Sequence, residues 1–101
     1  MIKAVFQANE DRYTSLDVSG HAEYGEYGKD LICASVSSIM FGFMNALDAL
    51  EEDVKIAQSE NRITIVDHSG SDVVKDYFEL VIMQLKTIEA SYGDFIRVER
   101  K

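Results

Sequence analysis

The fold class is decided by residues 30–50, DLICASVSSIMFGFMNALDAL. Before this stretch apolar residues recur at every second position, whereas within it they recur every three or four positions. This spacing places the apolar side chains on one face of an α-helix. The stripe consists of Ile32, Val36, Ile39, Phe43, Leu47 and Leu50. Four more apolar residues widen it, namely Ala34, Met40, Met44 and Ala46. We therefore expect a helix that is buried on more than one side.

Alternating patterns typical of half-buried strands flank this helix on both sides. Before it lie IKAVFQA at 2–8 and YTSLDVSG at 13–20, joined by a short polar loop. After it, DVKIAQ at 53–58 and RITIVD at 62–67 are expected to form two strands around a turn, and FIRVER at 95–100 a last strand.

A second helix is expected between the last two strands, with Ser71 as its N-cap. Its inner stripe is predicted to contain Val74, Tyr77, Phe78, Val81, Leu85, Ile88 and Tyr92. The order ββαββαβ predicts an α+β domain, with a mainly antiparallel sheet and two packed helices. No proline and no low-complexity linker divides the chain, so residues 1–101 are expected to form a single domain.

Composition narrows the possible partners. The chain carries 18 acidic and 10 basic residues, for a net charge of −8. Such a surface disfavours direct nucleic-acid binding and attracts basic partners, although it also serves solubility alone. We expect neither a signal peptide nor an apolar run near the roughly 18 residues of a membrane span. The single cysteine cannot form an internal disulfide, which favours a cytoplasmic location where the thiol stays reduced.

Residues 20–37, GHAEYGEYGKDLICASVS, place a histidine twelve residues before the only cysteine. If Asp30 is the N-cap of the helix, Cys33 lies in its first turn, where the helix dipole stabilises a thiolate. His21 could then accept the thiol proton and later deliver it to a leaving amine. Each residue also has a structural explanation: Cys33 as a buried apolar residue, His21 as a solvated side chain, Asp30 as a cap only and Ser37 as a small packing residue.

Two segments together, SGHA at 19–22 and GKDLICASVS at 28–37, closely resemble the ribosomal-processing cysteine protease family, Prp. The positions that match the family pattern are Gly20, His21, Ala22, Asp30, Leu31, Ile32, Cys33, Ala34, Ser35, Val36 and Ser37. The resemblance covers nearly the whole chain, including its length and its pattern of strands and helices.

The resemblance implies a cysteine endopeptidase that needs no cofactor. Family members remove a short N-terminal extension from large-subunit ribosomal protein twenty-seven, cleaving after a pair of phenylalanines. Cys33 would be the nucleophile and His21 the general base and acid. Gly20, Asp30 and Ser37 match other positions that are important in the family, and the resemblance also implies a homodimer.

Elementary chemistry gives these residues specific roles. The N–H groups of the helix's first turn are candidate donors to the oxyanion. Asp30 either caps the helix or orients His21, and we favour the cap. Ser37 would hydrogen-bond either the thiolate or a loop backbone group.

The loop at residues 22–29 is expected to act as a lid that closes on substrate. Its aromatic, acidic and glycine residues form the predicted substrate loop: Glu23, Tyr24, Gly25, Glu26, Tyr27 and Gly28. The aromatic rings would contact an apolar peptide, and the carboxylates would attract a lysine-rich stretch after the cut. An ordinary exposed loop is the plainer interpretation.

Other functions are also compatible with parts of this pattern. The main alternative is a non-catalytic module that binds a basic ribosomal protein or assembly factor, with Cys33 in its core. A zinc site made of His21, Asp30, Cys33 and His68 is disfavoured because no pair has metal-ligand spacing. A thiol hydrolase of small molecules is disfavoured too, because no segment resembles a cofactor or phosphate loop.

Overall fold

Strands and helices follow one another in the predicted order ββαββαβ in the computed structural model, which describes residues 1–20 and 27–101, with the side chains of 1–20 and 31–101. The elements are β1 (Ile2–Asn9), β2 (Arg12–Ser19), α1 (Tyr27–Leu50), β3 (Val54–Ser59), β4 (Arg62–Asp67), α2 (Asp72–Tyr92) and β5 (Ile96–Arg100). The predicted α+β class is confirmed.

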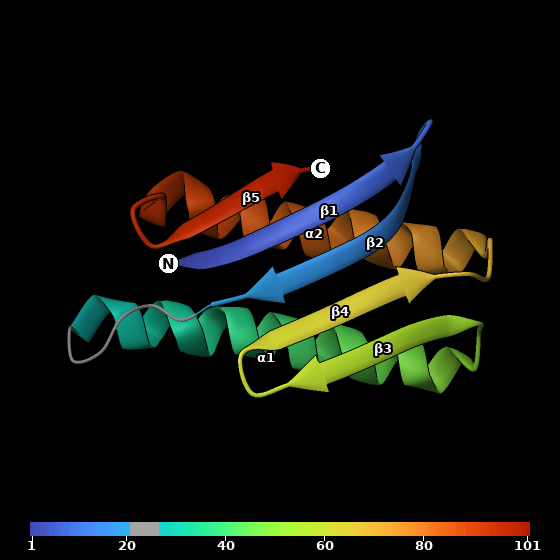
Figure 1. Ribbon diagram of the computed structural model, residues 1–101, viewed down its shortest axis with the longest axis horizontal. Helices are drawn as coiled ribbons and strands as arrows, with labels where there is room; N and C mark the ends of the chain where they lie inside the picture. The colour runs from blue at the N-terminus through green and yellow to red at the C-terminus, as the bar shows by residue number, and fades with distance from the viewer. Residues whose placement is uncertain (21–26) are drawn as a thin grey trace.

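The strands form one sheet in the order β3-β4-β2-β1-β5. Every neighbouring pair is antiparallel except β1 and β5, which run parallel. Figure 1 shows both helices on the same face of this sheet. Leu16 pairs with Phe6 on one side and Ile65 on the other, and all three are buried against the helices. Asp17, the next residue along β2, faces the opposite way because side chains alternate along a strand.

The core lies between the sheet and α1 and α2. In α1 the buried residues are Ile32, Val36, Met40, Phe43, Met44 and Leu47, while Ile39 and Leu50 are half-buried. The prediction that this helix is buried on more than one side is wrong, since Leu31 is 57% and Phe41 45% exposed. The reason is the two-layer architecture: no further element of the described chain covers the outer face of α1.

Hydropathy alone would make α1 a candidate membrane-spanning helix. Its Leu31–Leu50 stretch, with a mean hydropathy of 1.5, is long and apolar enough to cross a membrane by length and composition. The expectation that no run approaches this length is therefore wrong by this measure. The stretch contains the buried stripe that packs on the sheet, so a core helix accounts for its composition.

The inner stripe of α2 is mostly as predicted. Val74, Phe78, Val81 and Leu85 are buried, and Ile82 joins them although the sequence pattern did not include it. Tyr92 is instead 50% exposed, because it is the last residue of the helix and lies at the edge of the core. The predicted N-cap is confirmed: the Ser71 hydroxyl accepts a hydrogen bond from the Val74 N–H at 3.4 Å.

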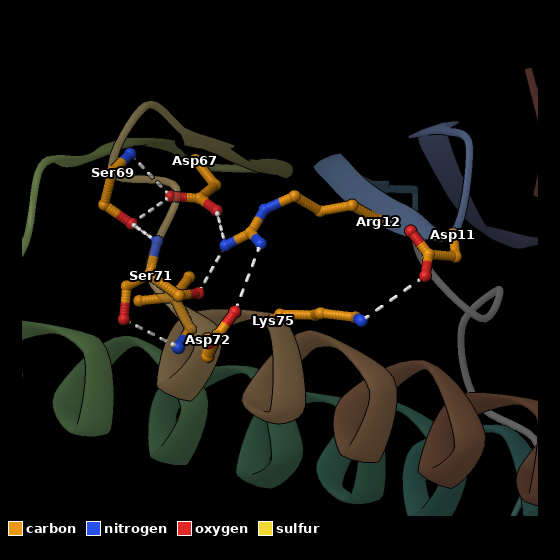
Figure 2. Close-up of polar contacts among 8 residues, drawn as sticks. Asp11, Arg12, Asp67, Ser69, Ser71, Asp72 and Lys75 are labelled. Carbon is orange, nitrogen blue, oxygen red and sulfur yellow. Dashed lines mark hydrogen bonds and ion pairs between the residues drawn. The ribbon is translucent and has the colours of Figure 1, made fainter.

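A buried carboxylate ties α2 to the β1–β2 hairpin (Figure 2). The Asp67 side chain, only 2% exposed, accepts hydrogen bonds from the N–H and hydroxyl of Ser69 at 2.8 and 2.6 Å. Arg12 lies 3.7 Å from the other Asp67 oxygen and donates to the carbonyl of Ser71. The Ser71 N–H in turn donates to the Ser69 hydroxyl at 3.0 Å. This network fixes the start of α2, at the end of the molecule opposite the first turn of α1.

We expect Asp67→Ala to lower the free energy of unfolding by about 2–4 kcal/mol, because it leaves Arg12 and Ser69 without their charged acceptor. Urea unfolding followed by circular dichroism measures this change. Asp72→Ala is the matched control: Asp72 also lies 3.7 Å from Arg12, but its side chain is 97% exposed. It should cost less than about 1 kcal/mol, and equal losses for the two variants would contradict the assignment.

Candidate active site

The first turn of α1 starts earlier than the sequence indicated. The helix begins at Tyr27, so Asp30 is its fourth residue and Cys33 its seventh. Only the first N–H groups of a helix lack partners within it, so the N–H of Cys33 donates inside the helix. The prediction that Asp30 is the N-cap is therefore wrong. The N–H groups of the first turn, predicted as oxyanion donors, are those of residues 27–30 and do not include that of Cys33. Asp is also favoured inside the first turn by the helix dipole, which explains the misplaced start.

Cys33 is not in a disulfide, and its half-buried side chain packs at the edge of the core. Ser37 follows one turn later, on the same side of α1. Both residues line one pocket of about 250 Å³. Because a helix in the core carries them, their backbone positions are fixed by packing rather than by a loop.

Gly20 directly follows the last residue of β2 and also lines this pocket. Its φ is +90°, and a Cβ atom at this position would overlap the backbone carbonyl oxygen of Met1. Its N–H donates to the carbonyl of Asn61 at 3.1 Å, which joins the end of β2 to the β3–β4 turn. Only glycine satisfies both the backbone angle and the close approach of Met1.

The structure thus brings Gly20, Cys33 and Ser37 to one pocket. Asp30 lies three residues before Cys33 in α1, and Tyr27 and Gly28 belong to the first turn of the same helix. The other predicted residues lie outside the described part of the chain: His21, Glu23, Tyr24, Gly25 and Glu26. The lid prediction therefore falls mostly on residues that the structure does not describe.

Sequence reasoning missed one wall of the pocket, the β3–β4 turn. Besides the turn residues Glu60 and Asn61, this wall contains the end of β3 and the start of β4, namely Gln58, Ser59, Arg62 and Ile63. Ser19 pairs with Arg62, and this register sets the turn beside Gly20 and opposite α1. The remaining lining residues come from β1, β2 and α1: Ile2, Val18, Val36, Met40 and Phe41.

Charge at the turn is partly compensated. Arg62 Nε donates to both carboxylate oxygens of Asp17, at 2.9 and 3.1 Å, and the Nη2 atom of Arg62 also donates to Asp17. The hydrogen bonds and charge of Asp17 raise the pKa of Arg62, so it remains a cation across the working pH range. Glu60 is the uncompensated charge on this wall, since none of the ion pairs between described residues involves it. The rim therefore favours a basic rather than an acidic peptide.

Among the described residues, no group of three or more His, Cys, Asp or Glu side chains could hold a metal ion. His68 is exposed in the β4–α2 connection, and its backbone N–H donates to the carbonyl of Asp53 at 2.9 Å. It lies at the far end of β4 from the pocket, so it does not share a site with Cys33.

A partly accessible thiol on a rigid helix, at the wall of a pocket, is the arrangement that a thiol-dependent enzyme requires. The family model for cysteine protease Prp matches residues 1–97. The chain belongs to the cysteine protease Prp family.

Characterised relatives agree with this assignment. The chain is 34% identical to the ribosomal processing cysteine protease Prp of Staphylococcus aureus strain Mu50 over 98 residues, which cover 92% of each protein. It is 31% identical to the Bacillus subtilis protein of the same name over 107 residues, covering 97% of this chain and 96% of the relative. A crystal structure of an essential ribosomal processing protease Prp from S. aureus, with a covalently linked product peptide, superimposes with a TM-score of 0.89 and 30% identity over the whole of both chains.

Proposed function

We propose that this protease removes the N-terminal extension of large-subunit ribosomal protein twenty-seven by cutting after a Phe-Phe pair. Cys33 is the nucleophile, and His21 is the general base and acid. The observation that carries this proposal is the place of Cys33 on the wall of a pocket shared with Gly20 and Ser37. The S. aureus relative with its covalently linked product peptide supports a covalent route.

The proposed reaction has two halves. His21 takes the thiol proton, and the Cys33 sulfur attacks the scissile carbonyl carbon to form a tetrahedral oxyanion. When the C–N bond breaks, His21 gives that proton to the leaving amine, and a thioester remains on Cys33. Water then attacks the thioester carbon, loses a proton to His21 and releases the acid product, while the sulfur leaves and is protonated again by His21.

Stabilisation of the oxyanion falls to side chains in this proposal, because the helix N–H groups near Cys33 are already bonded. The neutral side chains among the described pocket residues that can donate are the hydroxyls of Ser37 and Ser59 and the amides of Gln58 and Asn61. Asn and Gln amides and Ser hydroxyls can each supply an oxyanion donor. Ser37 is also close enough along α1, one turn from Cys33, to serve the thiolate instead.

Since Asp30 is not the cap, its remaining proposed role is to orient His21. Asp30→Asn should then lower kcat by about 10²–10⁴-fold, because an amide neither fixes the same imidazole tautomer nor balances its positive charge. Peptide cleavage kinetics and a thermal melt of the same sample measure the two effects. Activity near the wild-type level, or a loss of activity that the melt fully explains, would refute the orienting role.

We further propose that the enzyme is cytoplasmic and works as a homodimer. Light scattering coupled to gel filtration measures the mass of the particle against the 11.4 kDa of one chain. A single-chain mass at micromolar concentration would refute the dimer. Cell fractionation tests the location.

The function is tested by incubating the protein with a peptide that spans the extension and the Phe-Phe junction. Mass spectrometry should find a single cut after the second phenylalanine. A peptide with both phenylalanines replaced by alanine is the matched control and should stay intact. If neither the native peptide nor the full-length ribosomal protein is cut, a binding role for the same pocket becomes the better explanation.

A further inference from the structure

Three residues of α1, namely Cys33, Ser37 and Phe41, follow one another at intervals of four and line the same pocket. This spacing stacks them along one side of the helix. At 1.5 Å per residue, the Cα atom of Phe41 lies about 12 Å from that of Cys33. Long side chains on a helix lean toward its N-terminus, so the Phe41 ring covers the surface on the Cys33 side of its own Cα atom. Phe41 is therefore the lining residue of α1 that lies farthest along the helix from the thiol.

The pocket is apolar inside and polar at its rim. Val18, Val36 and Met40 are buried and form part of its lining, while Gln58 and Glu60 of the β3–β4 turn are exposed beside it. This distribution is typical of a site that binds an apolar group and orients it through a few polar contacts. Phe41 itself is a large aromatic residue that is 45% exposed. Much of its surface is thus available to a ligand.

Size limits what the pocket can hold. Its volume is about 250 Å³. An apolar cavity of about 150 Å³ is enough for a benzene molecule. One phenyl ring with its methylene group fits, whereas two rings do not.

We propose that this pocket is the subsite for one aromatic side chain of the substrate, and that Phe41 is the specificity-determining residue that sets its length. The proposal rests on the function proposed above, in which the cut follows two phenylalanines. Consecutive side chains of an extended peptide point to opposite sides, so only one of the two enters the pocket. The other phenylalanine binds elsewhere and does not depend on Phe41.

The test measures kcat/KM for three peptides, carrying Phe-Phe, Ala-Phe or Phe-Ala before the cut, with wild type and Phe41→Ala. Phe41→Ala should cut the Phe-Phe peptide about 10–100-fold less efficiently. The loss of kcat/KM caused by Phe41→Ala should be much smaller for one of the two peptides with a single phenylalanine, the one that already lacks the ring that occupies the pocket. The other peptide with a single phenylalanine should lose as much kcat/KM as the Phe-Phe peptide, because it still carries the ring that occupies the pocket. Equal loss for all three peptides would overturn the proposal.

Two further measurements separate this outcome from a damaged site. Replacing the occupying phenylalanine with tryptophan should slow wild type more than Phe41→Ala, since the variant has room for the larger ring. Leu80→Ala, which removes a 60% exposed apolar side chain from α2 outside this pocket, is the matched control and should leave all rates unchanged. If wild type cuts none of the peptides, the proposed function itself fails. If wild type cuts and Phe41→Ala keeps the same selectivity, only the subsite proposal fails.

Discussion

Cys33→Ala should abolish cleavage of the Phe-Phe peptide, with a loss of roughly 10⁴–10⁶-fold in kcat, while the fold survives. The loss is large because no other thiol exists in the chain to form the thioester. The fold should survive because the Cys33 side chain is only half-buried at the edge of the core. Its removal should therefore cost about 1 kcal/mol of unfolding free energy or less. Peptide kinetics and urea unfolding of the same preparation measure both quantities.

His21→Ala is the companion variant, and it should lower kcat by about 10²–10⁴-fold. It should also slow the alkylation of Cys33 by iodoacetamide near neutral pH, because the base proposed to take the thiol proton is then missing. Cys33→Ala controls for reaction of the reagent with other groups. Wild-type cleavage rates in either variant would refute the assigned dyad, whatever the peptide used.

Gly20→Ala should both destabilise the protein and remove most of its activity. The added Cβ atom overlaps the Met1 carbonyl oxygen, and a φ of +90° is strained for any residue with a Cβ atom. We expect a loss of about 2–4 kcal/mol, which lowers the melting temperature of a domain this size by roughly 10 °C or more. The backbone must shift just before His21, so activity should fall further than the unfolded fraction explains. A thermal melt and kinetics at a temperature well below the transition separate the two effects.

Two glycines supply controls that isolate the cause. Gly70 also has a positive φ, +68°, but a Cβ atom there meets nothing within 4 Å, so Gly70→Ala should show only the backbone strain of about 1–2 kcal/mol. Gly42 lies inside α1 with equally open space, and Gly42→Ala should be neutral or stabilising by up to about 1 kcal/mol. If Gly20→Ala lowers the free energy of unfolding no more than Gly70→Ala does, the overlap with Met1 does not contribute to the loss of stability.

Local patterns in the sequence were enough to predict the elements. The alternation of Ile2, Ala4 and Phe6 and the helical stripe of Ile32, Val36 and Phe43 each reflect burial on one face, and all six are buried. The start of α1 was harder to predict, because aspartate is favoured both as a cap and within the first turn. A local signal that fits both the cap and a position inside the helix cannot choose between them.

The pocket required information that no local pattern contains. The turn after β3 was expected as a turn, but its contact with Gly20 depends on the pairing of Ser19 with Arg62, far apart in the chain. Phe41 lies eight residues, or about two helical turns, after Cys33 and so falls on the same side of α1. The buried stripe that the sequence pattern identified contains Phe43 and not Phe41. The sequence alone could thus single out Cys33 as the proposed nucleophile, whereas the shape of the pocket around it follows from sheet pairing.

The parallel pairing of β1 with β5 bears on how the enzyme is made. Residue 2 pairs with residue 96, so β1 keeps an open edge until residue 96 has left the ribosome. Translation at 5–20 residues per second makes that interval several seconds long. Contacts of such long sequence separation also slow folding itself. Ile2, which lines the pocket, gains its second neighbouring strand only when β5 pairs with β1. We therefore expect a nascent chain to carry the Cys33 thiol for seconds before the domain around it is complete.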